Sequence, residues 1–191
     1  FATIKPNHGI GYVKIECIEK EFNTKCTPVK GYCLDGKRFV PIELLDVAGL
    51  IEDAHKGLGM GNQFLSDLNE ADALIHVIDI SGSTNEKGEP VQPLSHNPLK
   101  NVEILEKELD MWYLQILTKN WDKFVRITKQ TKEKLALAVS KQLSGLRVTE
   151  DIVKESLLKL NLQEDLEQWS DSSMLQLAHE LRIKSKPMII A

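Results

Sequence analysis

The stretch LLDVAGLIEDAHKGLGMGNQFL, residues 44–65, decides the fold of this 191-residue chain. It begins with an apolar run that ends in Asp46, and a glycine-rich loop follows. A helix with one apolar face is predicted next, over residues 62–70. Residues 73–79, ALIHVID, are almost all apolar, which is typical of a strand buried on both faces. Strand, loop, helix and buried strand in this order predict an α/β fold with a doubly wound sheet.

A β-hairpin is predicted before this stretch. Residues 9–16 alternate as a strand does, and residues 38–45 form an apolar-leaning partner strand. Asp35 and Gly36 lie between two strand-like runs, and Asp-Gly in that position is a strong signal for a tight turn. Such a hairpin places the loop that contains Thr3 beside the carboxyl end of the second strand.

A helical block occupies the second half of the chain. From Leu99 onward, apolar residues recur at the spacing of three and four that a packed helix requires. A second helix continues the pattern over 121–145, and two more are predicted over 150–160 and 171–184. The closing residues 186–191, KPMIIA, indicate the start of a buried strand. The predicted N-caps of the last two helices are Thr149 and Ser170.

The composition narrows the class of protein without excluding a nucleic-acid partner. The chain carries a net charge of −4 at pH 7, so its overall charge gives no support to nucleic-acid binding. No apolar run approaches the roughly 20 residues that a membrane-spanning helix needs, so no membrane partner is expected. Cys17, Cys26 and Cys33 are an odd number of cysteines, which makes a poor disulfide framework. They fit a reducing compartment, and we expect a cytoplasmic protein.

Thr3, Asp46 and Gly49 match the three groups that a phosphoryl-transfer switch requires. In such a switch a threonine hydroxyl contacts Mg²⁺, and an aspartate at the end of a strand holds the metal through water. A glycine lets its backbone N–H approach the γ-phosphate with no side chain in the way. D-x-x-G alone arises by chance in many proteins, and its position directly after a strand strengthens the hypothesis here.

Two longer stretches carry a family resemblance. FATIKPNHG, residues 1–9, and DVAGLIEDAHKGLGMGNQFLSDLNEADALIHVIDISGST, residues 46–84, closely resemble the Obg/YchF group of translation-factor-class GTPases. The helical block and the closing KPMIIA look like the archaeal YchF-related branch. The resemblance implies the G-domain fold of P-loop NTPases, which binds GTP with Mg²⁺; ATP is not excluded, since YchF relatives include ATP-preferring members. By this resemblance the switch I threonine is Thr3, and the switch II residues are Asp46, Val47, Ala48 and Gly49.

The resemblance also implies a division of the chain. Residues 1–95 are expected to form part of a G domain, residues 96–185 a helical insertion, and residues 186–191 a strand that returns to the G domain. The phosphate-binding loop, G-x-x-x-x-G-K-[ST], would precede Phe1, and the base-reading Asn-Lys-x-Asp would begin after Ala191. We therefore expect an internal fragment of a GTPase that is not competent alone.

Leu50 follows the switch II glycine at the position where many GTPases carry a glutamine that orients the attacking water. Leucine has no donor or acceptor, and the resemblance includes such a hydrophobic replacement. It assigns the water-positioning role to His55, whose neutral imidazole accepts a hydrogen bond near pH 7. The alternative is an ordinary solvated histidine in a glycine-rich loop.

Cys17, Cys26 and Cys33 are also candidate zinc ligands, with the spacing C-x8-C-x6-C. Structural zinc sites prefer C-x2–4-C pairs and four ligands. A hairpin insertion that happens to carry cysteines is therefore favoured, and zinc stays an open alternative.

The aromatic residues of the helical block are expected to pack rather than bind. Trp112, Tyr113, Trp121 and Trp169 have a helical spacing, which favours packing over the stacking of nucleic-acid bases. His76, inside the apolar strand, is expected to be a hydrogen-bonded core histidine.

A second hypothesis makes the helical block a non-enzymatic interaction module. Lysine-rich helix faces are usually solvated surface, but they also suit a ribosome or RNA partner. Nucleotide state would then only modulate that contact. The lysines are Lys119, Lys123, Lys129, Lys132, Lys134 and Lys141.

Overall fold

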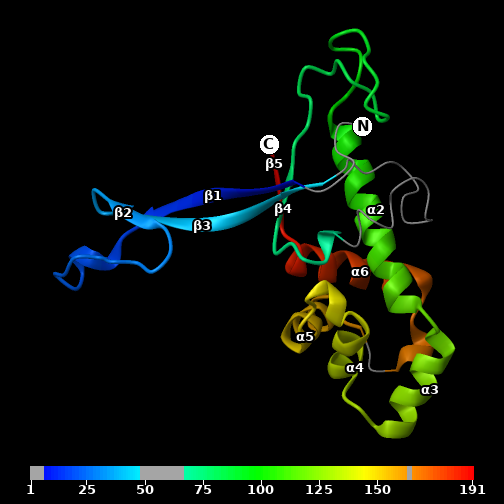
Figure 1. Cartoon of the computed structure of the whole chain (residues 1–191). Coiled ribbons are helices and arrows are strands. Elements are labelled where there is room, and N and C mark those ends of the chain that lie inside the picture. The colour runs from blue at the N-terminus through cyan, green and yellow to red at the C-terminus, as the bar shows by residue number, and fades with distance from the viewer. Residues whose placement is uncertain (1–6, 48–66, 163–164) are drawn as a thin grey trace. The chain divides into compact units, whose positions relative to one another are not determined.

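The computed structural model describes residues 7–47, 67–162 and 165–191 (Figure 1). The chain divides into two compact units, Phe1–Gly49 and Leu50–Ala191. Strands and helices occur in the order that the sequence predicts, which confirms the α/β class. Most of the helix predicted over 62–70 lies outside the described residues.

The first unit is a three-stranded antiparallel sheet with the order β1-β3-β2. Strands β1 (Asn7–Glu16) and β3 (Lys37–Asp46) pair along all ten residues of each, and β2 (Tyr32–Leu34) pairs with the first part of β3. The two long strands are the blue and cyan arrows of Figure 1. The predicted hairpin is confirmed, and the short strand β2 is an element that sequence reasoning missed.

The turn between β2 and β3 has the conformation that its sequence predicts. Asp35 and Gly36 have φ angles of 51° and 75°, and Leu34 pairs with Lys37 across them. A two-residue turn with both central φ angles positive matches the right-handed twist of the flanking strands, and Asp-Gly is among the sequences that tolerate it. The turn therefore sets the register of β2 on β3.

The second unit contains a small parallel sheet. Strand β4 (Leu74–His76) pairs with β5 (Met188–Ile190), so the strand predicted at the close of the chain is present. Both strands were expected to be buried, and this is wrong within the described residues: Ile75 of β4 is 57% exposed and Ile189 of β5 is 66% exposed. The reason is that β4 has only β5 as its partner in the part of the chain that the structure describes.

Four of the five α-helices that the structure describes in the second unit enclose one apolar core. Helix α2 (Leu99–Thr118) packs against α6 (Asp171–Ser185), and α4 (Leu135–Gln142) packs against α5 (Glu150–Lys159). Helix α3 (Trp121–Thr131) follows α2 in the chain (Figure 1). Fully buried side chains from four of these helices form the core: Leu109, Tyr113, Leu117, Val139, Val153, Leu177 and Leu181.

One predicted helix is two helices in the structure. Residues 121–145 were expected to form a single helix, but α3 ends at Thr131 because Lys132 adopts a left-handed conformation with φ 52°. The chain then changes direction and α4 begins at Leu135. The apolar spacing continues across this break, so periodicity alone does not reveal it.

The predicted N-caps of the last two helices are confirmed. The Thr149 hydroxyl accepts a hydrogen bond from the backbone N–H of Ile152, and the Ser170 hydroxyl accepts one from Ser173. Each cap satisfies a backbone donor that the first helical turn leaves without a partner.

A buried lysine ties the closing strand to the segment before β4. Lys186 is 2% exposed, and its ammonium group donates to the backbone carbonyls of Asn69, at 3.2 Å, and Ala71. The phenol of Tyr113 lies 2.8 Å from the hydroxyl of Ser185, which anchors the end of α6 to α2. Within residues 7–47, 67–162 and 165–191, no helix combines the length and apolar character needed to cross a membrane.

Candidate functional site

One end of the long hairpin carries the first predicted switch II residue, Asp46. Asp46 is the last residue of β3, and its partner across the sheet is Asn7, the first residue of β1. Thr3 is four residues before Asn7 in the sequence, so the two segments enter and leave the sheet at the same end. Asp46 is exposed, and Val47, which follows it, is half-buried. The other predicted site residues, Thr3, Ala48, Gly49 and His55, lie outside the described residues.

The chemistry of this end of the sheet suits a hydrated magnesium ion. Asp46 presents a carboxylate at a solvent-accessible strand end, and Mg²⁺ is bound in proteins through one or two carboxylates together with water and phosphate oxygens. Beside it, the ring nitrogen Nδ1 of His8 lies 2.9 Å from Oε1 of Glu43, and both side chains are exposed. A carboxylate with access to water is the donor that this metal requires, so the residue fits the ion.

Asp79 follows β4 and organises the loop after it, a role that sequence reasoning missed. Its Oδ1 accepts hydrogen bonds from the backbone N–H, at 2.9 Å, and the hydroxyl of Ser81. Its Oδ2 accepts from the N–H of Ser83 at 2.9 Å, from the Ser83 hydroxyl at 2.8 Å and from the Thr84 hydroxyl at 3.0 Å. Bonds from Ser81 and Ser83 hold the pKa of this carboxyl far below its usual range.

This Asp79 loop lies at the carboxyl end of a parallel strand, which is the edge where open α/β sheets bind their ligands. The sequence signal was available, because an aspartate followed by Ser-Gly-Ser-Thr directly after an apolar strand is a ready source of short-range hydrogen bonds. Within the loop, the carboxylate accepts bonds from hydroxyl and backbone groups, so the structure assigns it the role of holding this edge in one shape.

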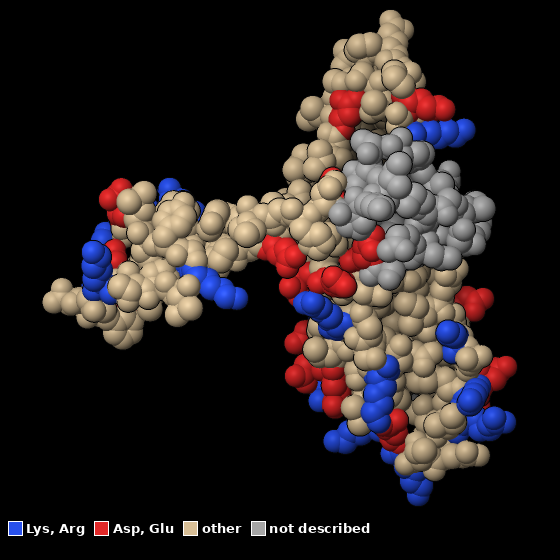
Figure 2. Space-filling view, in the orientation of Figure 1, with Lys and Arg blue, Asp and Glu red and all other residues tan. Residues whose placement is uncertain are grey.

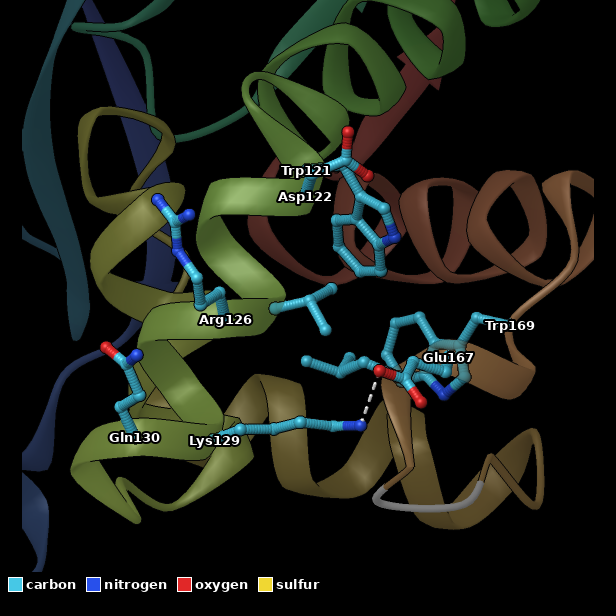
Figure 3. Close-up of a pocket in the computed structure, with 9 residues that line it drawn as sticks. Trp121, Asp122, Arg126, Lys129, Gln130, Glu167 and Trp169 are labelled. Atoms are coloured by element: carbon cyan, nitrogen blue, oxygen red, sulfur yellow. Dashed lines mark ion pairs between the residues drawn. The ribbon is translucent and has the colours of Figure 1, made fainter.

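A cavity of about 560 Å³ opens beside α3 (Figure 3). The Trp121 and Trp169 ring centroids lie 5.9 Å apart with an angle of 31° between their planes. Lys129 Nζ lies 2.7 Å from Glu167 Oε1, and the hydrogen bond that it donates to this carboxylate raises the pKa of Lys129. Because a neighbouring carboxylate pairs with this cation, the cavity is not by itself an anion site. Its lining residues are Trp121, Asp122, Val125, Arg126, Lys129, Gln130, Leu166, Glu167 and Trp169.

The expected packing role of the aromatic residues is confirmed for those in the core. Trp112 is 9% exposed and meets Tyr113 edge-on at 5.7 Å, and Trp169 is 8% exposed. The expectation of a hydrogen-bonded core histidine at His76 is wrong at Nδ1, which is buried and has no hydrogen-bond partner among the described residues. Burial lowers the pKa of His76, so the neutral imidazole is favoured there.

The three cysteines converge on one point of the first unit. The Sγ atoms of Cys17, Cys26 and Cys33 all lie within 4.8 Å of one another, although 16 positions separate the first from the last. Cys17 is buried, and the other two are half-buried. Spacing in the sequence argued against a metal site, and the convergence became visible only in the folded hairpin.

The region around α3 is cationic although the whole chain is acidic. Residues 119–134 contain six Lys or Arg residues and two acidic residues. Figure 2 shows blue side chains gathered at the lower end of the helical unit, where Figure 1 places α3. Lys123, Arg126 and Lys132 form no ion pair with any residue in the described ranges. This region is the counterpart, in the structure, of the lysine-rich helix face predicted from the sequence.

Comparison with known proteins places these features in a family. Residues 6–120 match the family described as "50S ribosome-binding GTPase". A GTP-binding protein of Methanocaldococcus jannaschii is 46% identical over all of this chain and 47% of its own length. The ribosome-binding ATPase YchF of Buchnera aphidicola is 34% identical over 71% of this chain and 36% of its own length. The crystal structure of a GTP-binding protein from Pyrococcus horikoshii, 38% identical, matches with a TM-score of 0.81 over 96% of this chain and 48% of its own.

The chain thus spans half or less of the length of these relatives. The family match covers more than half of the chain and includes the hairpin, Asp46 and the Asp79 loop. The relatives and the solved structure agree with that match across both units of the chain. The chain therefore belongs to the 50S ribosome-binding GTPase family and is of the Obg/YchF type within it.

Proposed function

We propose that the full-length protein is a nucleotide-dependent switch that binds GTP with Mg²⁺ and hydrolyses it. The observation that carries this proposal is the pairing of Asn7 with Asp46, because it sets the segment after Thr3 against the start of the D-x-x-G motif. Family membership supplies the nucleotide class. ATP is the alternative nucleotide, since the Asn-Lys-x-Asp motif that selects the base does not occur in these 191 residues.

Each switch residue has a separate role in this proposal. The hydroxyl of Thr3 contacts the metal, and the carboxylate of Asp46 holds it through water. The backbone N–H of Gly49 contacts the γ-phosphate, which a side chain at this position would obstruct. Val47 and Ala48 connect the metal-holding residue to the phosphate-sensing one and form part of the same nucleotide-binding segment. A Mg²⁺ ion held by these residues would neutralise charge on the phosphate oxygens.

The attacking water requires a different group. Leu50 occupies the position after the switch II glycine and cannot donate or accept a hydrogen bond. We assign the positioning of water to His55, five residues further on, through its neutral imidazole. Hydrolysis then depends on a side chain that makes little contribution to nucleotide affinity.

Two substitutions in the full-length protein test the switch. Asp46→Asn removes the metal-holding charge, and Gly49→Ala obstructs the γ-phosphate. Each is expected to lower GTP turnover by about 100-fold, the loss typical of one transition-state contact, and to make a non-hydrolysable GTP analogue bind no better than GDP. Binding by calorimetry and turnover by phosphate release measure the two effects.

Matched controls separate these effects from general damage. Asp151→Asn changes a carboxylate on α5 whose side chain is 87% exposed, and Gly145→Ala adds a methyl group where no atom lies within 4 Å. Both are expected to retain turnover and the preference for the triphosphate. Wild-type turnover in Asp46→Asn or Gly49→Ala would refute the assignment of the switch.

His55→Ala tests the positioning of water. The full-length variant is expected to lose about 100-fold in kcat, the lower end of the usual contribution of a general base, with less than about twofold change in the Kd for GTP. Single-turnover kinetics and equilibrium binding give the two values. A large loss of affinity with an unchanged single-turnover rate would show that His55 supports the loop instead.

A second function is favoured by the cationic region around α3: binding of RNA, as on a ribosomal surface. YchF of Buchnera aphidicola is named as ribosome-binding, and residues 119–134 provide the positive charge that a phosphate backbone attracts. Lys123→Glu and Lys132→Glu are expected to weaken cosedimentation with ribosomes and to reduce the salt dependence by about one unit of slope per phosphate contact. Lys154→Glu is the control, because Lys154 is paired with Glu150 on α5. Equal losses in all three variants would argue against a specific role for α3.

A further inference from the structure

The tip of the long hairpin is folded without an apolar core. Residues 17–36 leave β1, form the 3-10 turn Ile18–Lys20, and return through β2 to the Asp-Gly turn. Of these twenty residues only Cys17 and Gly36 are buried, while Phe22 is 68% exposed and Val29 is 101% exposed. Small segments that cannot bury enough apolar surface are usually held by disulfides or a bound metal.

Backbone contacts bring the three thiols together at this tip. The N–H of Cys17 donates to the carbonyl of Gly36 at 2.9 Å, which sets the end of β1 against the turn. Cys33 lies in β2 opposite Arg38. The N–H of Cys26 donates to Oε2 of Glu19 at 3.3 Å, so the segment between β1 and β2 folds back toward Cys17. The Sγ atoms of Cys17 and Cys33 are 3.5 Å apart.

These sulfur positions agree with metal ligation. Thiolates bound to Zn²⁺ at about 2.3 Å in a tetrahedral arrangement lie about 3.8 Å from one another. The 3.5 Å separation of Cys17 and Cys33 is close to that value, and Cys26 completes a triangle with no side longer than 4.8 Å. We propose that Cys17, Cys26 and Cys33 together bind one Zn²⁺ ion that stabilises the tip of the hairpin.

A disulfide explains the cluster less well. It would join two of the cysteines and leave the third thiol without a role, whereas the structure gathers all three. Burial, and the hydrogen bonds that the Cys33 thiol donates to the other two thiols, raise the pKa of Cys33 to about 12. A divalent cation reverses this effect by replacing the protons, so zinc affinity is expected to increase with pH.

The fourth ligand is either water or the carboxylate of Glu19. Glu19 is half-buried and already bonded to the backbone of Cys26, which places it beside one of the three sulfur ligands. Structural zinc sites are closed by four protein ligands, and a site with three keeps a position for solvent. A Glu19→Gln variant distinguishes the two, because an amide is a poorer ligand than a carboxylate.

The experiment uses the full-length protein, purified under reducing conditions in excess Mg²⁺ and supplied with Zn²⁺ or Co²⁺. Mass spectrometry of metal content is expected to find one Zn²⁺ per chain that a triple Cys→Ser variant lacks. Bound Co²⁺ is expected to show thiolate-to-metal charge-transfer absorption and the visible bands of a tetrahedral site. Cys26→Ser is expected to reduce Zn²⁺ affinity by at least 100-fold.

Matched variants complete the test. Val29→Ser changes a fully exposed residue of the segment between β1 and β2 and is expected to leave the Co²⁺ spectrum and Zn²⁺ affinity unchanged. Glu19→Gln is expected to change both if Glu19 is the fourth ligand, and to match its control Glu21→Gln if water is. Either result is compatible with the three-cysteine site, and the comparison shows only whether the fourth ligand is Glu19 or water.

The proposal is overturned if wild-type protein gives no charge-transfer band with Co²⁺ and its thiols react equally fast with and without a chelator. A mass lower by two hydrogens, with only one of the three clustered thiols left to titrate, would show that the cluster forms a disulfide and does not bind a metal. Both measurements are made on the unmodified chain, so a cysteine variant that fails to fold does not leave the question undecided.

Discussion

Arg182 on α6 donates through Nε to Oδ1 of Asp110 on α2 at 2.8 Å. Arg182 is 2% exposed, so its charge is buried at the contact between the two helices. Oδ2 of the same carboxylate lies 2.8 Å from Nδ1 of His179, and Glu106 lies 3.5 Å from Nη1 of Arg182. Asp110 therefore satisfies two partners at once, and the arrangement fixes the rotation of α6 on α2.

Asp110→Ala is expected to lower the free energy of unfolding by about 3 kcal/mol, because it leaves the buried Arg182 without its main partner. Glu155→Ala is the control. It breaks a 2.7 Å pair with Lys184 in which the glutamate is 68% exposed, and the expected loss is less than about 1 kcal/mol. Urea denaturation with unchanged slope measures both. Equal losses of stability in the two variants would show that the buried Asp110–Arg182 pair contributes no more than the exposed pair.

Lys186 is expected to make stability increase with pH above neutrality. Burial, together with the nearby charge of Arg147, lowers its pKa to about 8 from an ordinary value of 10.5. Between these values the unfolded chain binds more protons than the folded one, so the free energy of unfolding rises as pH rises from 8 toward 10.5. Lys186→Met removes this contribution. The free energy of unfolding of the wild type, minus that of Lys186→Met, should therefore increase from pH 8 toward pH 10.5.

Direct titration of the Lys186 ammonium by nitrogen NMR is expected to give a midpoint near 8. Lys154 provides the contrast within the same protein, since the hydrogen bond that it donates to Glu150 raises its pKa. Lys154→Met should therefore show no growth in the free-energy difference over the same pH range. A midpoint for Lys186 at or above that of Lys154 would contradict the role of burial.

Asp79 is expected to contribute stability that acid removes. Hydrogen bonds from Ser81 and Ser83 lower its folded-state pKa below the ordinary 3.8, so its contribution is present above that pH and is lost as pH falls toward the folded-state value. Asp79→Asn should lower Tm at pH 7, and the difference from wild type should narrow below about pH 4. Ser81→Ala should reproduce part of the effect. A difference that stays constant from pH 7 to pH 2 would show that the charge is not involved.

Gly31→Ala is expected to disrupt the hairpin tip. Gly31 has φ +71°, and a Cβ there would collide with the backbone carbonyl of Phe39 on the neighbouring strand. Gly88 is the matched control, because its φ is +72° and no atom lies within 4 Å of an added Cβ. Gly88→Ala should lower the free energy of unfolding by only about 1 kcal/mol, the cost of a left-handed alanine, and Gly31→Ala should lower it by about 3 kcal/mol. Hydrogen exchange of the β3 amides and of the Gly88 loop reports each local loss.

Local signals predicted much of this fold correctly. The alternation over 9–16, the Asp-Gly turn and the Thr149 and Ser170 caps each depend on a few neighbouring residues, and all of them are present in the structure. The break at Lys132 was not predictable in the same way. A lysine has no intrinsic preference for a left-handed conformation, so residue type at this position does not reveal the break.

In the candidate site, too, some residues could be predicted from local sequence and others could not. Asp46 was identified from D-x-x-G at a strand end, and the structure adds its pairing with Asn7. Asp79 was missed because its importance depends on five hydrogen bonds made by the loop after it. The sequence spacing of the cysteines argued against a common site, and the hairpin register brings all three sulfurs together.

The fold class, the long hairpin, the family and the order of the switch residues could be predicted from the amino-acid sequence, because each depends on residue type and short-range spacing. The contacts between distant groups became visible only in the folded chain: Arg182 with Asp110, Lys186 with the carbonyls before β4, and three thiols at one hairpin tip. The physical reason is that such contacts depend on strand register and helix rotation. Those are set by the packing of the whole unit, and no local pattern encodes them.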